Sequence, residues 1–333
     1  MDIGIDLGTA NVMISMGNKG VVLNEPSVVA FNKRLNEVIA VGEEAYRMVG
    51  RTPEHITVVR PLSDGVISDH KMTKLMIMAF IEKVTGKQLF MPNIVMCVPS
   101  SITDVESRAV IEAAKNAGAR QVYLIDEPVA AIMGAGVDIS NADGNMVVDI
   151  GGGTTDIAVV SMNGVVTKKS VKMAGNKLDK AIVRYVSNRY RILIGEKMAE
   201  NAKIAAANIY SPDGSRKIVV KGRHLVRGLP EQIELSDYDI YEAIIDNINE
   251  MISAVKSVLE KTPPELVGDI YQNGIYLTGG GALLYGLDKL MSSQIGVPCH
   301  IADDPLSCVA KGTRYAFKKL DTLLDGFEQV TMI

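Results

Sequence analysis

Cysteine and histidine are scarce in this sequence of 333 residues, and their spacing excludes the commonest disulfide and zinc sites. The three cysteines, Cys97, Cys299 and Cys308, lie in apolar or helical patterns and form no C-x-x-C pair. We therefore expect buried, reduced thiols in a cytosolic protein. The four histidines are scattered along the chain without the spacing of metal ligands.

Long apolar runs are also missing. No segment reaches the ~18 consecutive apolar residues of a transmembrane helix, so any contact with a membrane must be peripheral. The first residues carry Asp2 and Asp6, which is unlike a signal peptide, and we expect none. A net charge of −4 gives no reason to expect nucleic acid as a partner. A hydrophobic content of 47% over this length predicts an ordinary globular protein of about two domains.

Two common nucleotide-binding motifs are absent as well. The sequence has no G-x-x-x-x-G-K-[ST] loop, and no glycine cluster fits the G-x-G-x-x-G pattern, which needs a helix directly after the turn. Residues 149–156 (DIGGGTTD) instead join two apolar stretches, 146–148 and 157–161, that are typical of strands. The expected element is a strand, a glycine-rich turn and a second strand.

This expected hairpin has the chemistry of a phosphate-binding loop. Glycines let the backbone approach an anion closely and turn successive N–H groups toward it. Thr154 and Thr155 add hydroxyl donors, and the Asp149 carboxylate can hold a hydrated Mg²⁺ ion. Taken alone, the segment fits a plain glycine-rich hairpin as well.

The amino terminus repeats the design. Residues 3–7 have the apolar pattern of a strand and contain Asp6. The chain then turns through Gly8 and Thr9, and a second strand is expected over 12–15. Because each half of the chain opens with such a unit, the sequence predicts duplicated halves that face each other across a cleft.

Alternating strand and helix patterns between the two hairpins favour a mostly parallel sheet, and hence an α/β fold. A strand over 122–125 delivers Glu127 at its carboxyl end and so into the same cleft, although a carboxylate before proline is also typical of a helix cap. A third glycine cluster, residues 279–281, follows a strand and is expected to open a helix over 283–293. It suits the adenine or the α-phosphate of a nucleotide.

The polar link over residues 140–145 predicts the boundary between a first lobe, residues 1–142, and a second lobe, residues 143–304. Smaller subdomains are expected over about 32–65 and about 180–243. A last helix over about 305–330 is expected to pack back on the first lobe.

Several motifs together resemble the MreB family of bacterial actins, within the actin/Hsp70/sugar-kinase superfamily. They are residues 4–11 (GIDLGTAN), 25–30 (EPSVVA), 126–131 (DEPVAA), 144–149 (GNMVVD), 261–267 (KTPPELV), 277–284 (LTGGGALL) and 304–306 (DPL). The resemblance runs from residue 2 to about 320. It implies an actin-like two-lobed α/β fold of duplicated ribonuclease-H-like domains, with a nucleotide cleft between them and a smaller subdomain inserted in each.

The resemblance also implies roles for individual residues. Asp6 and Asp149 match the aspartates linked to Mg²⁺, and Glu127, Asp149 and Thr154 match the catalytic positions, where Glu127 orients the attacking water. The implied nucleotide contacts are Gly8, Thr9, Ala10, Asn11, Gly151, Gly152, Gly153, Thr154, Glu200, Lys203, Gly279, Gly280, Gly281 and Ala282. For Glu200 and Lys203, an i, i+3 pair, a solvated helix face is the alternative.

Three positions depart from the family pattern: Asp126 and Asp156 stand where glutamate is usual, and Ala205 stands in place of an acidic residue. None of them removes a phosphate or metal contact. The resemblance therefore implies ATP/ADP and Mg²⁺ as ligands and slow ATP hydrolysis coupled to polymerisation.

The implied partners are further copies of the chain, in double protofilaments, and the cytoplasmic membrane surface. The protein is expected to be cytoplasmic and peripheral at the inner face of the membrane, where Leu89 and Phe90 insert or, alternatively, begin a core strand. Membrane proteins of the shape-determining machinery are expected as further partners, and cell shape as the role. The alternatives are a non-hydrolysing or motility-dedicated filament and a small-molecule kinase of the superfamily.

Overall fold

Each half of the chain begins with an antiparallel hairpin that starts a larger sheet. The computed structural model describes residues 2–86, 91–100, 102–319 and 327–329. The first sheet has the order β19-β10-β9-β1-β2-β3, and the second has the order β13-β12-β11-β17-β18. The strands of the first are β1 (Asp2–Leu7), β2 (Asn11–Met16), β3 (Gly20–Pro26), β9 (Asn93–Val98), β10 (Gln121–Asp126) and β19 (Phe327–Gln329). Those of the second are β11 (Asn145–Ile150), β12 (Thr155–Ser161), β13 (Gly164–Val171), β17 (Ile275–Thr278) and β18 (Cys299–Ile301).

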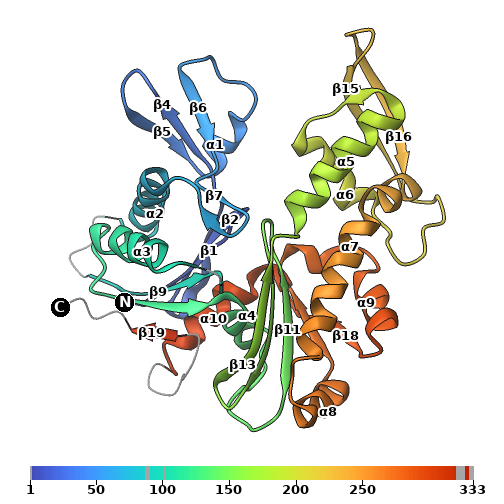
Figure 1. Cartoon of the computed structure of the whole chain (residues 1–333). Coiled ribbons are helices and arrows are strands. Elements are labelled where there is room, and N and C mark those ends of the chain that lie inside the picture. Colours follow the sequence, from blue (N-terminus) through green and yellow to red (C-terminus); the bar gives the residue numbers. More distant parts are fainter. Residues whose placement is uncertain (1, 87–90, 101, 320–326, 330–333) are drawn as a thin grey trace.

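The pairing of the two hairpins confirms the predicted duplication. Strand β1 pairs antiparallel with β2 and parallel with β9. Strand β11 pairs in the same way, antiparallel with β12 and parallel with β17. Figure 1 shows the resulting two lobes side by side, joined at their base, with a smaller sheet above each.

Helices on both faces bury the first sheet. On one face, α2 (His70–Thr85) and α3 (Asp104–Asn116) pack Met76, Phe80 and Val110 against the strands. On the other face lie α4 (Glu127–Gly134) and α10 (Cys308–Ala316). Val147 and Ala158 of the second sheet belong to the core that α4 completes, so α4 lies between the two large sheets.

Glycine lets α4 and α10 cross in backbone contact. A Cβ added to Gly134 would lie 1.7 Å from the Cys308 carbonyl oxygen, and one added to Gly312 would lie 1.8 Å from the Ala130 carbonyl oxygen. Any side chain at either glycine would therefore separate the two helices.

Each lobe carries a small sheet at the far end from this crossing (Figure 1). In the first lobe it comprises β4 (Val29–Asn32), β5 (Glu37–Val41) and β6 (Ile56–Val59), with α1 (Glu43–Arg47), and the short hairpin β7 (Leu62–Ser63) and β8 (Val66–Ile67) follows. In the second lobe it comprises β14 (Ile192–Leu193), β15 (Lys217–His224) and β16 (Pro230–Ser236), with α6 (Glu196–Ala206).

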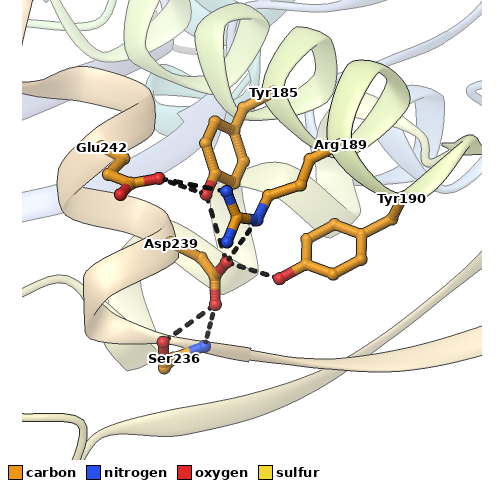
Figure 2. A network of polar contacts seen from close by, with 6 residues as sticks. All are labelled: Tyr185, Arg189, Tyr190, Ser236, Asp239 and Glu242. Atoms are coloured by element: carbon orange, nitrogen blue, oxygen red, sulfur yellow. Dashed lines mark hydrogen bonds and ion pairs between the residues drawn. The ribbon is translucent and has the colours of Figure 1, made fainter.

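The second lobe is built on two long helices, α5 (Gly175–Tyr190) and α7 (Asp237–Leu259), with α9 (Leu287–Ile295) beside α7 and α8 (Pro264–Asn273) below it. Figure 2 shows how Asp239 ties α5 to the first turn of α7. Its carboxylate accepts hydrogen bonds from the Tyr190 hydroxyl at 2.6 Å and from the Ser236 N–H at 2.9 Å, and Arg189 lies 3.9 Å away. Burial raises the pKa of Asp239, but these hydrogen bonds outweigh it and leave the pKa below its usual value.

Two sequence predictions about helices are wrong. The helix expected over about 305–330 is shorter: α10 ends at Ala316, and residues 327–329 form strand β19, which pairs antiparallel with β10 and covers its open hydrogen-bonding edge. The helix expected over 283–293 begins only at Leu287, because Gly286 has a φ of 84°, which interrupts an α-helix. A short 3₁₀ turn, Gly280–Leu283, follows the third glycine cluster instead.

Candidate functional site

A cavity of about 500 Å³ lies between the two lobes. It is bounded by the turns that follow β1, β10, β11 and β17, by the start of α5, and by one face of α6. Its volume is in the range of ordinary small-ligand sites. Because its walls come from both lobes, a ligand in it would bridge them.

The first glycine turn, residues 8–10, is held from behind by Ser27. The Ser27 hydroxyl donates to the Gly8 carbonyl oxygen at 2.5 Å, and the Ser27 N–H donates to the Ala10 carbonyl oxygen at 2.9 Å. With these carbonyl groups engaged on the far side, the amide side of the turn is left for a ligand.

The second glycine turn, residues 151–153, is held in the same manner by α5. The Gly175 N–H donates to the Gly151 carbonyl oxygen at 3.2 Å, and the Asn176 N–H donates to the Gly152 carbonyl oxygen at 2.8 Å. Gly175 and Asn176 also line the cavity, and the sequence analysis missed both of them. Their only sequence signal is a small residue followed by a polar one at a helix start, which is too common to identify a site.

The two turns lie against each other across the cavity. A Cβ added to Gly152 would lie 2.7 Å from the Ala10 Cβ, and one added to Gly153 would lie 2.8 Å from the Thr9 hydroxyl oxygen. Turns from opposite lobes thus close on one space, and neither glycine has room for a side chain.

The β7–β8 hairpin is a further element of the site that the sequence analysis missed. Its tip consists of Asp64 and Gly65, both with positive φ, at 51° and 71°. The Gly65 N–H donates to the Thr9 hydroxyl at 3.3 Å, and a Cβ added to Gly153 would lie 2.9 Å from the Asp64 Cα. The Asp-Gly pair was the available signal, since it favours a tight hairpin turn.

Three carboxylates line the same cavity: Asp149, which is buried, and Asp6 and Glu127, which are half-buried. Burial, and then the charge of Asp149, raise the pKa of Asp6 to about 8. Burial also raises the pKa of Asp149 to about 7, with the nearby Asp156 adding to the effect and a hydrogen bond from the Thr278 hydroxyl, at 2.6 Å, opposing it. Burial, followed by the charge of Asp156, raises the pKa of Glu127 well above its usual value.

These carboxylates fit a divalent cation bound together with a phosphate. Asp6 and Asp149 come from opposite lobes, and the pKa of each is raised mainly by burial and further by a neighbouring carboxylate. Among the described residues, no group of three or more His, Cys, Asp or Glu side chains forms a closed metal site. Mg²⁺ does not need one, because it commonly uses one or two carboxylates and completes its shell with water and phosphate oxygens.

The raised carboxylate pKa values predict how the stability of the ligand-free protein depends on pH. From about pH 4 upward, to about pH 7 for Asp149 and about pH 8 for Asp6, the folded protein keeps protons on these groups that the unfolded chain has lost, so the free energy of unfolding should fall as pH rises. Melting temperatures, measured without nucleotide and Mg²⁺, should fall more steeply with pH for the wild type than for Asp149→Asn. Equal slopes would contradict the prediction.

The opposite end of the cavity is formed by α6 and the third glycine cluster. Glu200 and Lys203 both line it. The Lys203 ammonium lies 2.8 Å from the Asp179 carboxylate and donates to the Gly175 carbonyl oxygen at 3.2 Å. Asp179 was missed by the sequence analysis, because nothing in the spacing of α5 and α6 links the two residues.

Gly279, Gly280 and Gly281 line the cavity, whereas Ala282 does not. Ala282 is fully buried in the core of the second lobe. The glycines pass close to the end of β11, since a Cβ on Gly281 would lie 2.1 Å from the Ile150 side chain. The nucleotide contact expected from Ala282 therefore has no counterpart in the lining of the cavity.

The remaining site residues of the sequence analysis either line the cavity or lie outside the described part of the chain. The cavity is lined by Asp6, Gly8, Thr9, Ala10, Asn11, Glu127, Asp149, Gly151, Gly152, Gly153, Thr154, Glu200 and Lys203. Leu89 and Phe90 lie outside the described residues. Within the described residues, no helix has the length and apolar character needed to span a bilayer.

Comparison with known proteins extends the similarity to nearly the whole chain. The family model described as MreB/Mbl protein matches residues 1–325. The cell shape-determining protein Mbl of Bacillus subtilis (strain 168) is 50% identical over 323 residues, which are 97% of this chain and 97% of that protein.

Solved structures agree with this match. The crystal structure of MreB 5 of Spiroplasma citri bound to AMPPNP has a TM-score of 0.90 and 38% identity, covering 96% of both chains. The MamK double helical filament has a TM-score of 0.81 over 95% of this chain and 98% of that one, and at 20% identity it supports the fold alone. The predicted actin-like fold is thus confirmed, and the chain belongs to the MreB/Mbl family of actin-like proteins.

Proposed function

We propose that this chain binds ATP with Mg²⁺ between its lobes, assembles into filaments and hydrolyses the ATP slowly. One observation carries the proposal: two glycine turns from opposite lobes meet at one cavity that also contains Asp6, Asp149 and Glu127. A triphosphate gripped by both turns would hold the lobes together. The relative of known structure from Spiroplasma citri is bound to AMPPNP, which supports a nucleotide as the ligand of this chain.

Each residue of the cavity has a separate role in binding or hydrolysing the nucleotide. Bound Mg²⁺, held through Asp6 and Asp149, would neutralise charge on the phosphates. Thr278 orients the Asp149 carboxylate through its hydroxyl. Glu127, the first residue of α4, accepts a hydrogen bond from the attacking water and aligns it, with Thr154 of the second lobe as its partner across the cavity. Glu200 and Lys203 contact the ribose and adenine at the other end of the cavity.

The cellular part of the proposal rests on relatives and on two residues. Mbl of Bacillus subtilis is a cell shape-determining protein, which supports a role of these filaments in cell shape. Copies of this chain are the first partners, in double protofilaments. Leu89 and Phe90 are proposed to attach the filaments to the inner face of the cytoplasmic membrane, beside membrane proteins of the shape-determining machinery.

Electron microscopy combined with a phosphate-release assay tests the proposal. Purified protein with ATP and Mg²⁺ should form filaments of paired strands and release phosphate slowly, whereas protein without nucleotide should form few or none. The same samples should release no phosphate from ATP once Mg²⁺ is chelated. Filaments without phosphate release would favour the non-hydrolysing alternative, and the absence of both would contradict the proposal.

A further inference from the structure

A side chain of the first lobe reaches across the mouth of the cavity to a residue that lines it. Tyr46 lies on α1 in the small subdomain of the first lobe, and Glu200 lies on α6 in that of the second. The Tyr46 hydroxyl donates a hydrogen bond to the Glu200 carboxylate at 3.4 Å. Figure 1 shows α1 and α6 on opposite sides of the molecule, well above the large sheets.

The ring of Tyr46 also contacts one cation from each lobe. The Lys197 ammonium, one turn before Glu200 on α6, lies 4.5 Å from the ring centroid. The Arg60 guanidinium carbon, in the first lobe, lies 5.7 Å from it. Both distances are within the range of attractive cation–π contacts. Tyr46 packs in addition on the small core formed with Ala45, so its ring is held in place from its own side.

The two polar residues that α6 contributes to the cavity are therefore held differently. Lys203 is fixed within the second lobe, by Asp179 and the Gly175 carbonyl group. Glu200 takes its hydrogen bond from the first lobe. The direction of the Glu200 carboxylate consequently depends on how close the two small subdomains are. The direction of the Lys203 ammonium group does not depend on it.

We infer that Tyr46 is a positioning residue for the nucleotide, which holds the Glu200 carboxylate against the ribose when the small subdomains meet. This inference rests on the proposed function, in which Glu200 contacts the ribose. It adds that a hydrogen bond between the two lobes, from Tyr46 to Glu200, helps to retain the nucleotide without touching it. Burial, and then the Glu200 charge, raise the pKa of Tyr46, so its hydroxyl remains a donor at neutral pH.

Tyr46→Phe is the informative variant, because it removes the hydroxyl and keeps the ring with its packing and cation contacts. Loss of this hydrogen bond should speed ATP dissociation about fivefold. The preference for ATP over 2′,3′-dideoxy-ATP should shrink to a similar degree. The single-turnover hydrolysis rate of bound ATP should not change, because Glu127 is untouched. Tyr271→Phe, an exposed tyrosine on α8, is the matched control and should behave as the wild type.

A second variant separates action through Glu200 from a general structural effect. In a Glu200→Ala background, Tyr46→Phe should cause no further change in dissociation rate or ribose preference. An equal effect in both backgrounds would overturn the inference. The inference would also be overturned if Tyr46→Phe had the ATP dissociation rate and the ribose preference of the wild type. Because the wild type would still bind ATP, that result would leave the proposed function intact. A wild-type protein that binds no ATP would overturn the proposed function, and the inference with it.

Discussion

Replacing Glu127 with alanine is expected to slow phosphate release from ATP by roughly a hundredfold or more. Glu127 is half-buried at the start of α4 and lines the cavity near both aspartates, so it is well placed to align a water molecule rather than to hold the nucleotide. Nucleotide affinity should stay near that of the wild type or rise slightly, because a negative charge near the triphosphate is removed. A phosphate-release assay and a fluorescent-nucleotide titration measure the two quantities separately.

Glu250→Ala serves as the control for this change. Glu250 is an exposed helical residue of α7, so the same substitution there should alter neither quantity. Filaments of Glu127→Ala, assembled with ATP, should also persist longer than wild-type filaments. If Glu127→Ala releases phosphate at the wild-type rate, another residue must align the water.

Replacing Gly153 with valine is expected to lower ATP affinity about a hundredfold, since overpacking of this kind costs up to about 3 kcal/mol. The new Cβ would meet the Thr9 hydroxyl at 2.8 Å and the Asp64 backbone at 2.9 Å, both in the other lobe. The phosphate turns can then no longer approach each other, and filament formation with ATP should be lost. Isothermal titration with ATP and Mg²⁺ measures the affinity.

Gly268→Val is the matched control for the valine at position 153. Gly268 lies on α8 with open space around it, so the same substitution should leave ATP affinity unchanged. Circular dichroism shows whether both variants keep their secondary structure. Wild-type ATP affinity in a folded Gly153→Val protein would contradict the idea that both turns grip one ligand.

The parts of the fold that local chemistry dictates could be predicted from the sequence. The capping box of Thr103 and Glu106 begins α3, and Ser236 begins α7. Both hairpins form because a short glycine-rich turn allows a tight connection between two apolar strands. The expectation that Asp6 and Asp149 face one space also depends on local pattern, since each belongs to a strand that ends at the same kind of turn.

The features that the sequence could not predict depend on contacts between distant segments. Strand β19 forms because β10 offers an open edge about 200 residues earlier in the chain, which no local pattern of residues 327–329 reveals. Asp179 enters the site only because α5 and α6 pack together and bring it to Lys203. Ala282 continues the glycine cluster in sequence, but the 3₁₀ turn directs it into the core.

The close crossing of α4 and α10 gives the molecule a pivot. In the described part of the chain, the backbone passes from one large sheet to the other twice, over residues 135–144 and over 302–307, and both passages adjoin this crossing. A relative rotation of the lobes must therefore turn about it, with each lobe acting as a lever arm. The contact between Tyr46 and Glu200 joins α1 and α6 in the small subdomains, which Figure 1 shows above the large sheets. A rotation of a few degrees at the glycine pair would thus displace the small subdomains by ångströms, so that a ligand bound between the lobes could change the outline of the whole molecule.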